Sequence, residues 1–170
     1  MHAAEPLPHF VDDYLSFLYE VHPTGATMDG VHVHDDLIED YRRSAIDTHV
    51  SALAGFARRL DSIPHEQLRL REQIDHQIVS SNIRARQFEL EATRSWERNP
   101  HVYADTLASS LAAQSIFTYA PETDRARRVL SKLRQVPRLV QAARDNIKNS
   151  FGVAGHQGIL RYHCCLASPP

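Results

Sequence analysis

Apolar residues recur at intervals of three and four along most of this chain, which is the period of an amphipathic helix. The pattern predicts about six helices, at roughly 8–21, 37–60, 64–96, 101–119, 121–136 and 137–149. No segment alternates apolar and polar residues in the period-two manner of a strand. The predicted fold class is therefore all-α.

One face of the third predicted helix carries the longest uninterrupted apolar stripe of the chain: Leu70, Ile74, Ile78, Ser81, Ala85, Phe88, Ala92 and Trp96. About 30 residues of helix would span about 45 Å, whereas a compact chain of 170 residues is about 40 Å across. The pattern predicts an elongated bundle around one very long central helix, which either stands alone or belongs to a larger protein.

The segment from His22 to Asp36 separates the first two predicted helices and holds two of the six glycines and three of the eleven histidines. Glycine reaches backbone angles closed to other residues, so Gly25 and Gly30 favour a compact turn. Asp36, followed three residues later by Glu39, resembles a capping box at the start of the next helix. The segment is predicted to join two helices and set their angle.

The helical period stops after residue 149. The predicted organisation is one helical domain, 1–149, followed by an irregular and aberrant tail, 150–170. The tail holds four side chains of metal-ligand type: His156, His163, Cys164 and Cys165. The adjacent cysteines lack the Cys-x-x-Cys spacing of zinc sites and form no disulfide framework. The abrupt change suggests a truncated or frameshifted product.

Charge and hydropathy narrow the classes of partner. Nineteen basic against twenty-one acidic residues give a net charge of −2, so nothing pulls the chain toward nucleic acid or an anionic membrane surface. No apolar run approaches the roughly 18 residues that a membrane span needs. The N-terminus lacks the basic and apolar regions of a signal peptide. The predicted location is the cytoplasm.

Three histidines are weak candidates for metal binding: His22, His32 and His34. His32 and His34 could lie on one side of an extended segment with Asp35 and Asp36 nearby, a donor set that zinc accepts. Solvated loop histidines and carboxylates at a helix start explain the same residues without a metal. No catalytic or cofactor-binding residue is assigned.

Other constellations have simpler structural explanations. His65-Glu66 opens like the zinc-peptidase motif His-Glu-x-x-His, but Arg69 stands where the second histidine is needed. Glu72 and His76, one helical turn apart, match a surface ion pair. Four aromatic residues are expected in the core: Trp96, Tyr103, Phe117 and Tyr119. A solvated basic face is expected from Arg125, Arg127, Arg128, Lys132, Arg134 and Arg138.

Four ordered motifs carry a family resemblance: His22-Pro-x-x-Ala-Thr27-x-x-Gly30-x-His32-x-x-Asp35, Leu70 to Asp75, Trp96-x-x-Asn99-Pro100-x-x-Tyr103, and Arg128 to Pro137. Together they resemble the bacterial family called domain of unknown function 885 (DUF885), over roughly His9 to Asn149. Members of that family resemble zinc metallopeptidases of the carboxypeptidase type, mostly helical and in two lobes.

The resemblance implies zinc for full-length members, bound by a His-Glu-x-x-x-x-His motif in the C-terminal half of a chain several times longer than this one. Nothing in residues 1–170 matches that motif, so no catalytic or metal residue carries over. One function is then a non-catalytic N-terminal unit forming one wall of a substrate cleft, with a peptide substrate or the missing C-terminal half as its partner. The alternative is a standalone helical protein-interaction module.

Overall fold

A computed structural model describes residues 6–150 of the chain, with side chains placed through residue 147, and every regular element in that range is helical. The elements are α1 (Leu7–Val21), α2 (Pro23–Met28), α3 (Arg43–Asp61), α4 (Leu70–Phe88), α5 (Ser95–Arg98), α6 (His101–Ile116) and α7 (Glu122–Ser150). A 3-10 turn (His65–Gln67) precedes α4, and a π-helical turn (Glu89–Thr93) follows it. The predicted all-α class is confirmed over this range.

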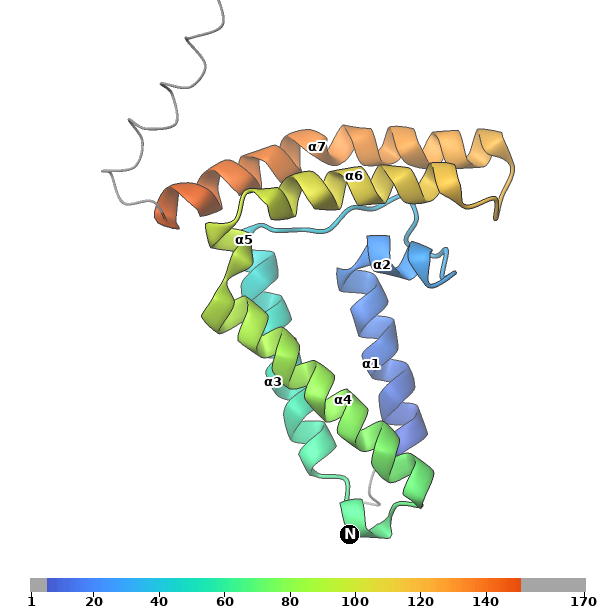
Figure 1. Cartoon of the computed structure of the whole chain (residues 1–170), viewed down its shortest axis with the longest axis vertical. Helices are drawn as coiled ribbons and strands as arrows, with labels where there is room; N and C mark the ends of the chain where they lie inside the picture. Colours follow the sequence, from blue (N-terminus) through green and yellow to red (C-terminus); the bar gives the residue numbers. More distant parts are fainter. Residues whose placement is uncertain (1–5, 151–170) are drawn as a thin grey trace, which may run out of the picture.

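The helices form two groups (Figure 1). α1, α3 and α4 make an elongated group, and the paired α6 and α7 lie across one end of it. Contacts between the groups are made by the short helices, since α2 packs on α6 and α5 packs on α7. Between α2 and α3 the chain runs without helix alongside the α6/α7 pair. Within residues 6–150, no helix has the length and apolar character needed to cross a bilayer.

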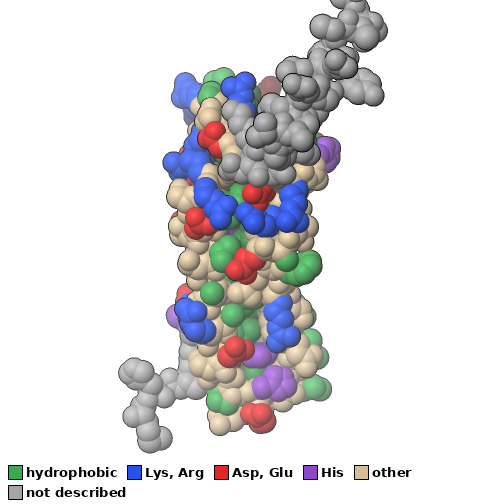
Figure 2. Space-filling view, turned by 90° about the vertical axis from the view of Figure 1, so that its left-hand side faces the viewer, with side chains coloured by type: hydrophobic (Ala, Val, Ile, Leu, Met, Phe, Trp, Pro, Cys, Tyr) green, Lys and Arg blue, Asp and Glu red, His purple; other side chains and the backbone are tan. Residues whose placement is uncertain are grey.

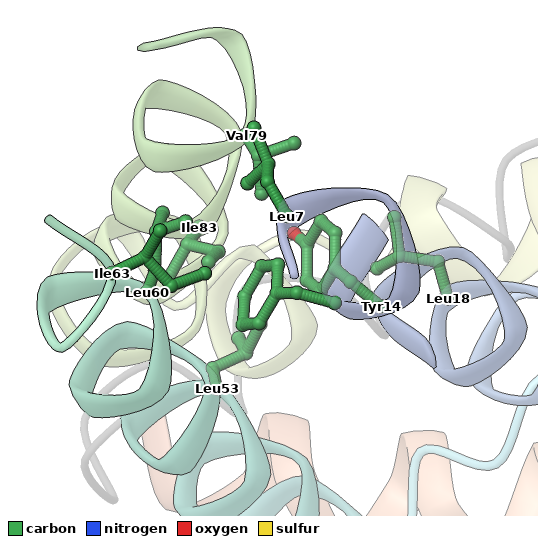
Figure 3. Packing of buried hydrophobic residues seen from close by; sticks show 9 residues of the cluster. Leu7, Tyr14, Leu18, Leu53, Leu60, Ile63, Val79 and Ile83 are labelled. Carbon is green, nitrogen blue, oxygen red and sulfur yellow. The ribbon is translucent and has the colours of Figure 1, made fainter. Parts of the chain in front are cut away.

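The larger core lies between α1, α3 and α4. Figure 3 shows its buried side chains from close by: Leu7, Phe10, Tyr14, Leu18, Leu53, Leu60, Ile63, Val79 and Ile83. Phe56 meets the rings of Phe10 and Tyr14 edge-on, with centroids 5.8 and 5.3 Å away. The Tyr14 hydroxyl donates to Asn82 Oδ1 at 2.7 Å. Burial of each large apolar side chain contributes about 2 kcal/mol to stability.

A smaller core joins α6, α7 and the segment before α3, around Ile38, Tyr103 and Leu139. Asn146 of α7 is 4% exposed. Its Nδ2 donates to the Tyr41 carbonyl at 2.7 Å and to the Tyr103 hydroxyl at 2.9 Å. The Tyr103 hydroxyl in turn donates to the Trp96 carbonyl of α5. This chain of hydrogen bonds fixes the junction between the two helical groups.

The predicted long helix ending at Trp96 is interrupted. α4 ends at Phe88, and the π-helical turn leads to Arg94, whose φ of 53° lies in the left-handed region and starts a new direction for α5. The two last predicted helices are instead one, because α7 continues through Pro137 for 29 residues. That makes α7, at about 43 Å, the longest helix of the described residues. Pro137 removes the amide partner of the Leu133 carbonyl; both residues are exposed, so water can reach that carbonyl.

The apolar stripe predicted to be the core face of α4 points to solvent. Leu70 is 76%, Ile74 50%, Ile78 61% and Phe88 67% exposed. The core is filled from the opposite side of the helix, by Val79 and Ile83. The prediction of a helix here is confirmed, whereas the assignment of its buried face is wrong.

Candidate functional site

The stretch from His22 to Asp36 is half helix and half turn. Pro23 stands at the start of α2, where a missing amide hydrogen and a fixed φ favour a first turn. After α2 the chain turns at Gly30, whose φ of 83° is costly for any residue with a side chain. The predicted turn is therefore confined to the residues after Met28.

Glu39 caps α2 and not the helix that follows it. Its Oε1 accepts from the Thr24 amide at 3.1 Å, and its Oε2 accepts from the Thr24 hydroxyl at 2.9 Å. A carboxylate is favourable at this end of a helix because the free amides carry partial positive charge. The predicted capping box of Asp36 and Glu39 is wrong, since α3 begins only at Arg43 and Asp36 is exposed.

Asp35 is the centre of a buried polar cluster and is 2% exposed. Its Oδ1 accepts from the Thr27 hydroxyl at 2.5 Å, and its Oδ2 lies 3.0 Å from His32 Nδ1. Arg128 of α7 donates from Nη1 to the same Oδ2. Burial alone would raise the pKa of Asp35, but the Thr27 hydrogen bond and the nearby charge of Arg128 bring that pKa below its usual value. The carboxylate is thus ionised and fully engaged at neutral pH.

The same cluster orients the imidazole of His32. Its ring stacks on Tyr119 with centroids 3.6 Å apart and planes 6° apart. Because Asp35 is the acceptor at Nδ1, the neutral ring is assigned its hydrogen there, which leaves the Nε2 lone pair unused by this contact. An imidazole backed by a carboxylate is chemically suited to accept a proton or to ligate a metal. The side chain is 30% exposed.

Lys132 is fully buried in the interface between α7 and the segment before α3. Its Nζ donates to the Leu37 carbonyl at 2.8 Å, and burial lowers the pKa of the ammonium group. The predicted solvated basic face is therefore wrong for Lys132, whereas Arg127 is indeed on the surface, with 76% of its side chain exposed. The sequence contained a signal for the burial of Lys132, because Lys132, Leu139 and Asn146 follow one another every seven residues and so share one face of α7.

A second cluster surrounds a cavity of about 70 Å³ lined by His22, His49, Arg86, Glu89 and Leu90. The rings of His22 and His49 are 5.4 Å apart. The Nε2 of each is buried, with no hydrogen-bond partner among the described residues. Burial, helped by the charge of Arg86, lowers the pKa of both histidines to about 4. Both imidazoles are neutral at pH 7.

The three candidate metal ligands do not share one site. His32 pairs with Asp35, and His22 faces His49 across the cavity. His34 accepts a hydrogen bond at its carbonyl from the Leu37 amide at 3.0 Å. Within residues 6–147, no three His, Cys, Asp or Glu side chains are grouped so as to hold a metal ion. The tail candidates lie outside the described residues: His156, His163, Cys164 and Cys165.

The other candidates take structural roles. Glu72 caps α4 by accepting from the Arg69 amide at 2.9 Å. His76 Nε2 lies 3.4 Å from the Leu60 carbonyl, and its ring meets that of His65 at 5.3 Å. Glu72 and His76, which were expected to pair with each other, therefore each contact a different partner.

The four aromatic residues expected in the core divide in two. Trp96 and Tyr103 are buried there, at 4% and 5% exposed. Phe117 is 39% exposed, and Tyr119 packs on His32. The prediction is correct for the first pair and wrong for the second, because α6 ends at Ile116 before either is reached.

An apolar groove lies on the surface between α6 and α7. Its volume is about 470 Å³, and its lining includes Tyr103, Leu107, Leu139, Ala143 and Ile147. Arg144 stands in the lining as the charged side chain. The groove and the outer face of α4 are apolar surfaces that the described helices leave open.

Comparison with known families decides the relationship that the ordered motifs indicated. The model of DUF885, described as a bacterial protein of unknown function, matches residues 23–157. The chain belongs to the DUF885 family. The DUF885 match continues past Asn149, where the resemblance was expected to end.

A solved structure from Shewanella oneidensis, described as a proposed lipoprotein of unknown function, has the same arrangement with a TM-score of 0.78 and 24% sequence identity. The alignment covers 85% of this chain and 26% of the Shewanella chain. At this identity the likeness shows the fold alone. The DUF885 chain thus spans about a quarter of the length of that relative. No curated protein matches the chain.

Proposed function

We propose that this DUF885 chain is a non-catalytic helical unit of a larger hydrolase, in which it forms one wall of a substrate cleft. Peptide hydrolysis, its zinc ion and the peptide substrate enter the proposal from the family resemblance of the sequence. The described residues offer no three-ligand group for zinc, so the proposal assigns this unit no catalytic step. The polypeptide outside the unit supplies that chemistry.

The observation that supports the proposal is the size of the structural relative. The same fold accounts for 26% of the Shewanella chain, so in that protein the unit is embedded in a much longer polypeptide. The cluster around Asp35 is consistent with a positioning role, because its hydrogen bonds join α2 to α7. A cytoplasmic location remains a prediction, and the description as a lipoprotein applies to the Shewanella protein alone.

The second candidate function is a standalone helical interaction module. The groove between α6 and α7 favours it, since an apolar surface of this kind on a single unit marks a binding site for a partner. In this alternative the chain acts by binding an apolar segment of another protein in that groove.

A peptidase assay tests the leading proposal. The purified chain is incubated with peptide and ester substrates, with added zinc and with a chelator, beside an established zinc carboxypeptidase as the positive control. We expect no turnover above background from the chain. Hydrolysis that needs zinc and is lost with the chelator would show that the unit is catalytic by itself.

Light scattering and thermal melting separate the two candidates. A monomer that melts in one cooperative transition supports the interaction module. Aggregation, or a broad transition with strong binding of a hydrophobic dye, supports a unit whose apolar surfaces are covered in a larger protein.

A further inference from the structure

α4 carries large apolar residues on two opposite faces. Val79 and Ile83 fill the core with α1 and α3, whereas Ile74, Ile78 and Phe88 are at least half exposed on the other side. A helix with large apolar residues on two opposite faces can pack against neighbours on both sides. In the described residues α4 has neighbours on one side only, so the large apolar residues of its outer face are open to solvent there.

The outer face has the spacing of a helix-docking seam. From Ile74 the seam residues follow at alternating steps of four and three, through Ile78, Ser81 and Ala85 to Phe88, which is the repeat that packs one helix along another. Ser81 and Ala85 are small and lie between larger residues, so a second helix can approach closely at the middle of the seam. Figure 2 shows the side of the molecule where α3, α5 and the C-terminal end of α4 lie, with hydrophobic side chains exposed among charged ones.

Charged residues border the seam with opposite signs. At 100° per residue, Asp75 falls on one edge of the seam and Arg84 on the other. Two copies of α4 paired antiparallel about Ser81 would place Asp75 of one copy opposite Gln87 of the other, and Arg84 opposite Ile78, so neither border charge would meet an opposite charge. The borders thus gain no ion pair from this self-pairing and favour a different helix, with a basic residue beside Asp75 and an acidic residue beside Arg84.

We propose that the outer face of α4 is an intramolecular docking surface in larger DUF885 proteins, and that its occupant is an amphipathic α-helix from the polypeptide outside this unit. This inference rests on the proposed function, since it identifies the partner of the same unit. The Shewanella relative supplies the material for such a helix, because most of its chain lies beyond the shared fold. The binding mode is that of a helix laid along an apolar seam, read through residues three and four apart.

The test uses synthetic peptides that tile the part of the Shewanella chain outside the shared fold. Each peptide has about 25 residues, or roughly seven helical turns, carries a fluorophore, and is titrated with the purified chain. We expect at least one peptide to bind and to gain helix on binding. Ile78→Glu should weaken that binding about tenfold or more, as loss of a central apolar anchor does, while Ile78→Leu should retain it.

Ser51→Glu is the matched control, because it adds the same charge at an exposed position of α3, away from the seam. It should leave binding unchanged. Ile78 is 61% exposed, so Ile78→Glu should melt at the temperature of the unmodified chain, which separates lost binding from lost folding.

Three results would overturn the inference: no peptide binds, binding is indifferent to Ile78→Glu, or the seam is occupied by a second copy in a dimer that Ile78→Glu dissociates. Zinc-dependent hydrolysis by the chain alone would defeat the proposed function instead. That result comes from a separate assay, so the two failures can be told apart.

Discussion

Arg128 of α7 donates a hydrogen bond from Nη1 to Oδ2 of Asp35, 93 positions earlier in the chain. The Asp35 side chain is 1% exposed and that of Arg128 is 29% exposed. Through Thr27, the same carboxylate also holds α2. One buried charge thus connects α2, the turn after it and α7, and it fixes the signature stretch of the family against the α6/α7 pair.

Arg128→Ala should lower the free energy of unfolding by about 3 kcal/mol, because it leaves the Asp35 carboxylate buried without its cation. Urea denaturation followed by circular dichroism measures the change. Arg127→Ala is the control: its side chain is 76% exposed and pairs with Asp124 at 2.6 Å, an exposed pair worth less than about 1 kcal/mol. Equal losses in the two variants would contradict a special role for the Asp35 contact.

The cavity between His22 and His49 predicts instability toward acid. Both histidines have a pKa of about 4 in the folded protein against 6.5 for the free side chain. Below pH 6.5 the unfolded chain therefore binds protons that the folded chain excludes, and the free energy of unfolding falls as the pH drops from 6.5 to 4. Melting temperatures recorded across this window should decrease steadily.

His49→Leu should flatten part of that decrease, because it removes one of the two buried imidazoles while keeping an apolar contact for Phe17, whose ring lies 5.3 Å from that of His49. His101→Leu, at an exposed position at the start of α6, is the control and should keep the slope of the unmodified chain. If the slope were the same in both variants, acid sensitivity would come from other groups.

Periodicity predicted the helices well but could not choose between two apolar faces of one helix. In α1 only one face is strongly apolar, and Tyr14 and Leu18 are buried as the spacing indicates. In α4 the more regular stripe, with Ile74 and Ile78, faces out, and the core takes Val79. The deciding factor is tertiary: α1 and α3 approach α4 from one side, which no local pattern records.

The candidate site depended even more on distant contacts. The sequence identified His32 and Asp35 as a group, and the structure places them 3.0 Å apart. It could not show that Arg128 completes the group, nor that Glu39 turns back to Thr24. Local capping rules assign Glu39 to the nearest helix start, and the extended path of residues 37–42 along α7 carries it to another helix.

Gly30→Ala should destabilise the protein by about 1 kcal/mol. Its φ of 83° is strained for alanine although no atom lies within 4 Å of the added Cβ, so the cost is conformational. Gly25→Ala, five residues earlier within α2, should instead stabilise by about 0.5 kcal/mol, because its Cβ meets only His22 Cβ at 3.8 Å and alanine favours the helix. Opposite signs in urea denaturation would confirm the turn. Equal destabilisation would contradict it.

Pro137→Ala tests whether α7 is one helix. Alanine restores an amide that can donate to the Leu133 carbonyl and relieves the clash of the proline ring, which together are worth about 3 kcal/mol. The unfolded chain regains freedom worth about 0.5–1 kcal/mol, so a net stabilisation of about 2 kcal/mol is expected by urea denaturation. Pro8→Ala, in the first turn of α1 where no amide partner exists, should change stability little. Destabilisation by Pro137→Ala would contradict this expectation. It would mean that α7 must bend at residue 137 to bring Leu139 and Asn146 onto the segment before α3, so that packing there requires the proline although the helix alone disfavours it.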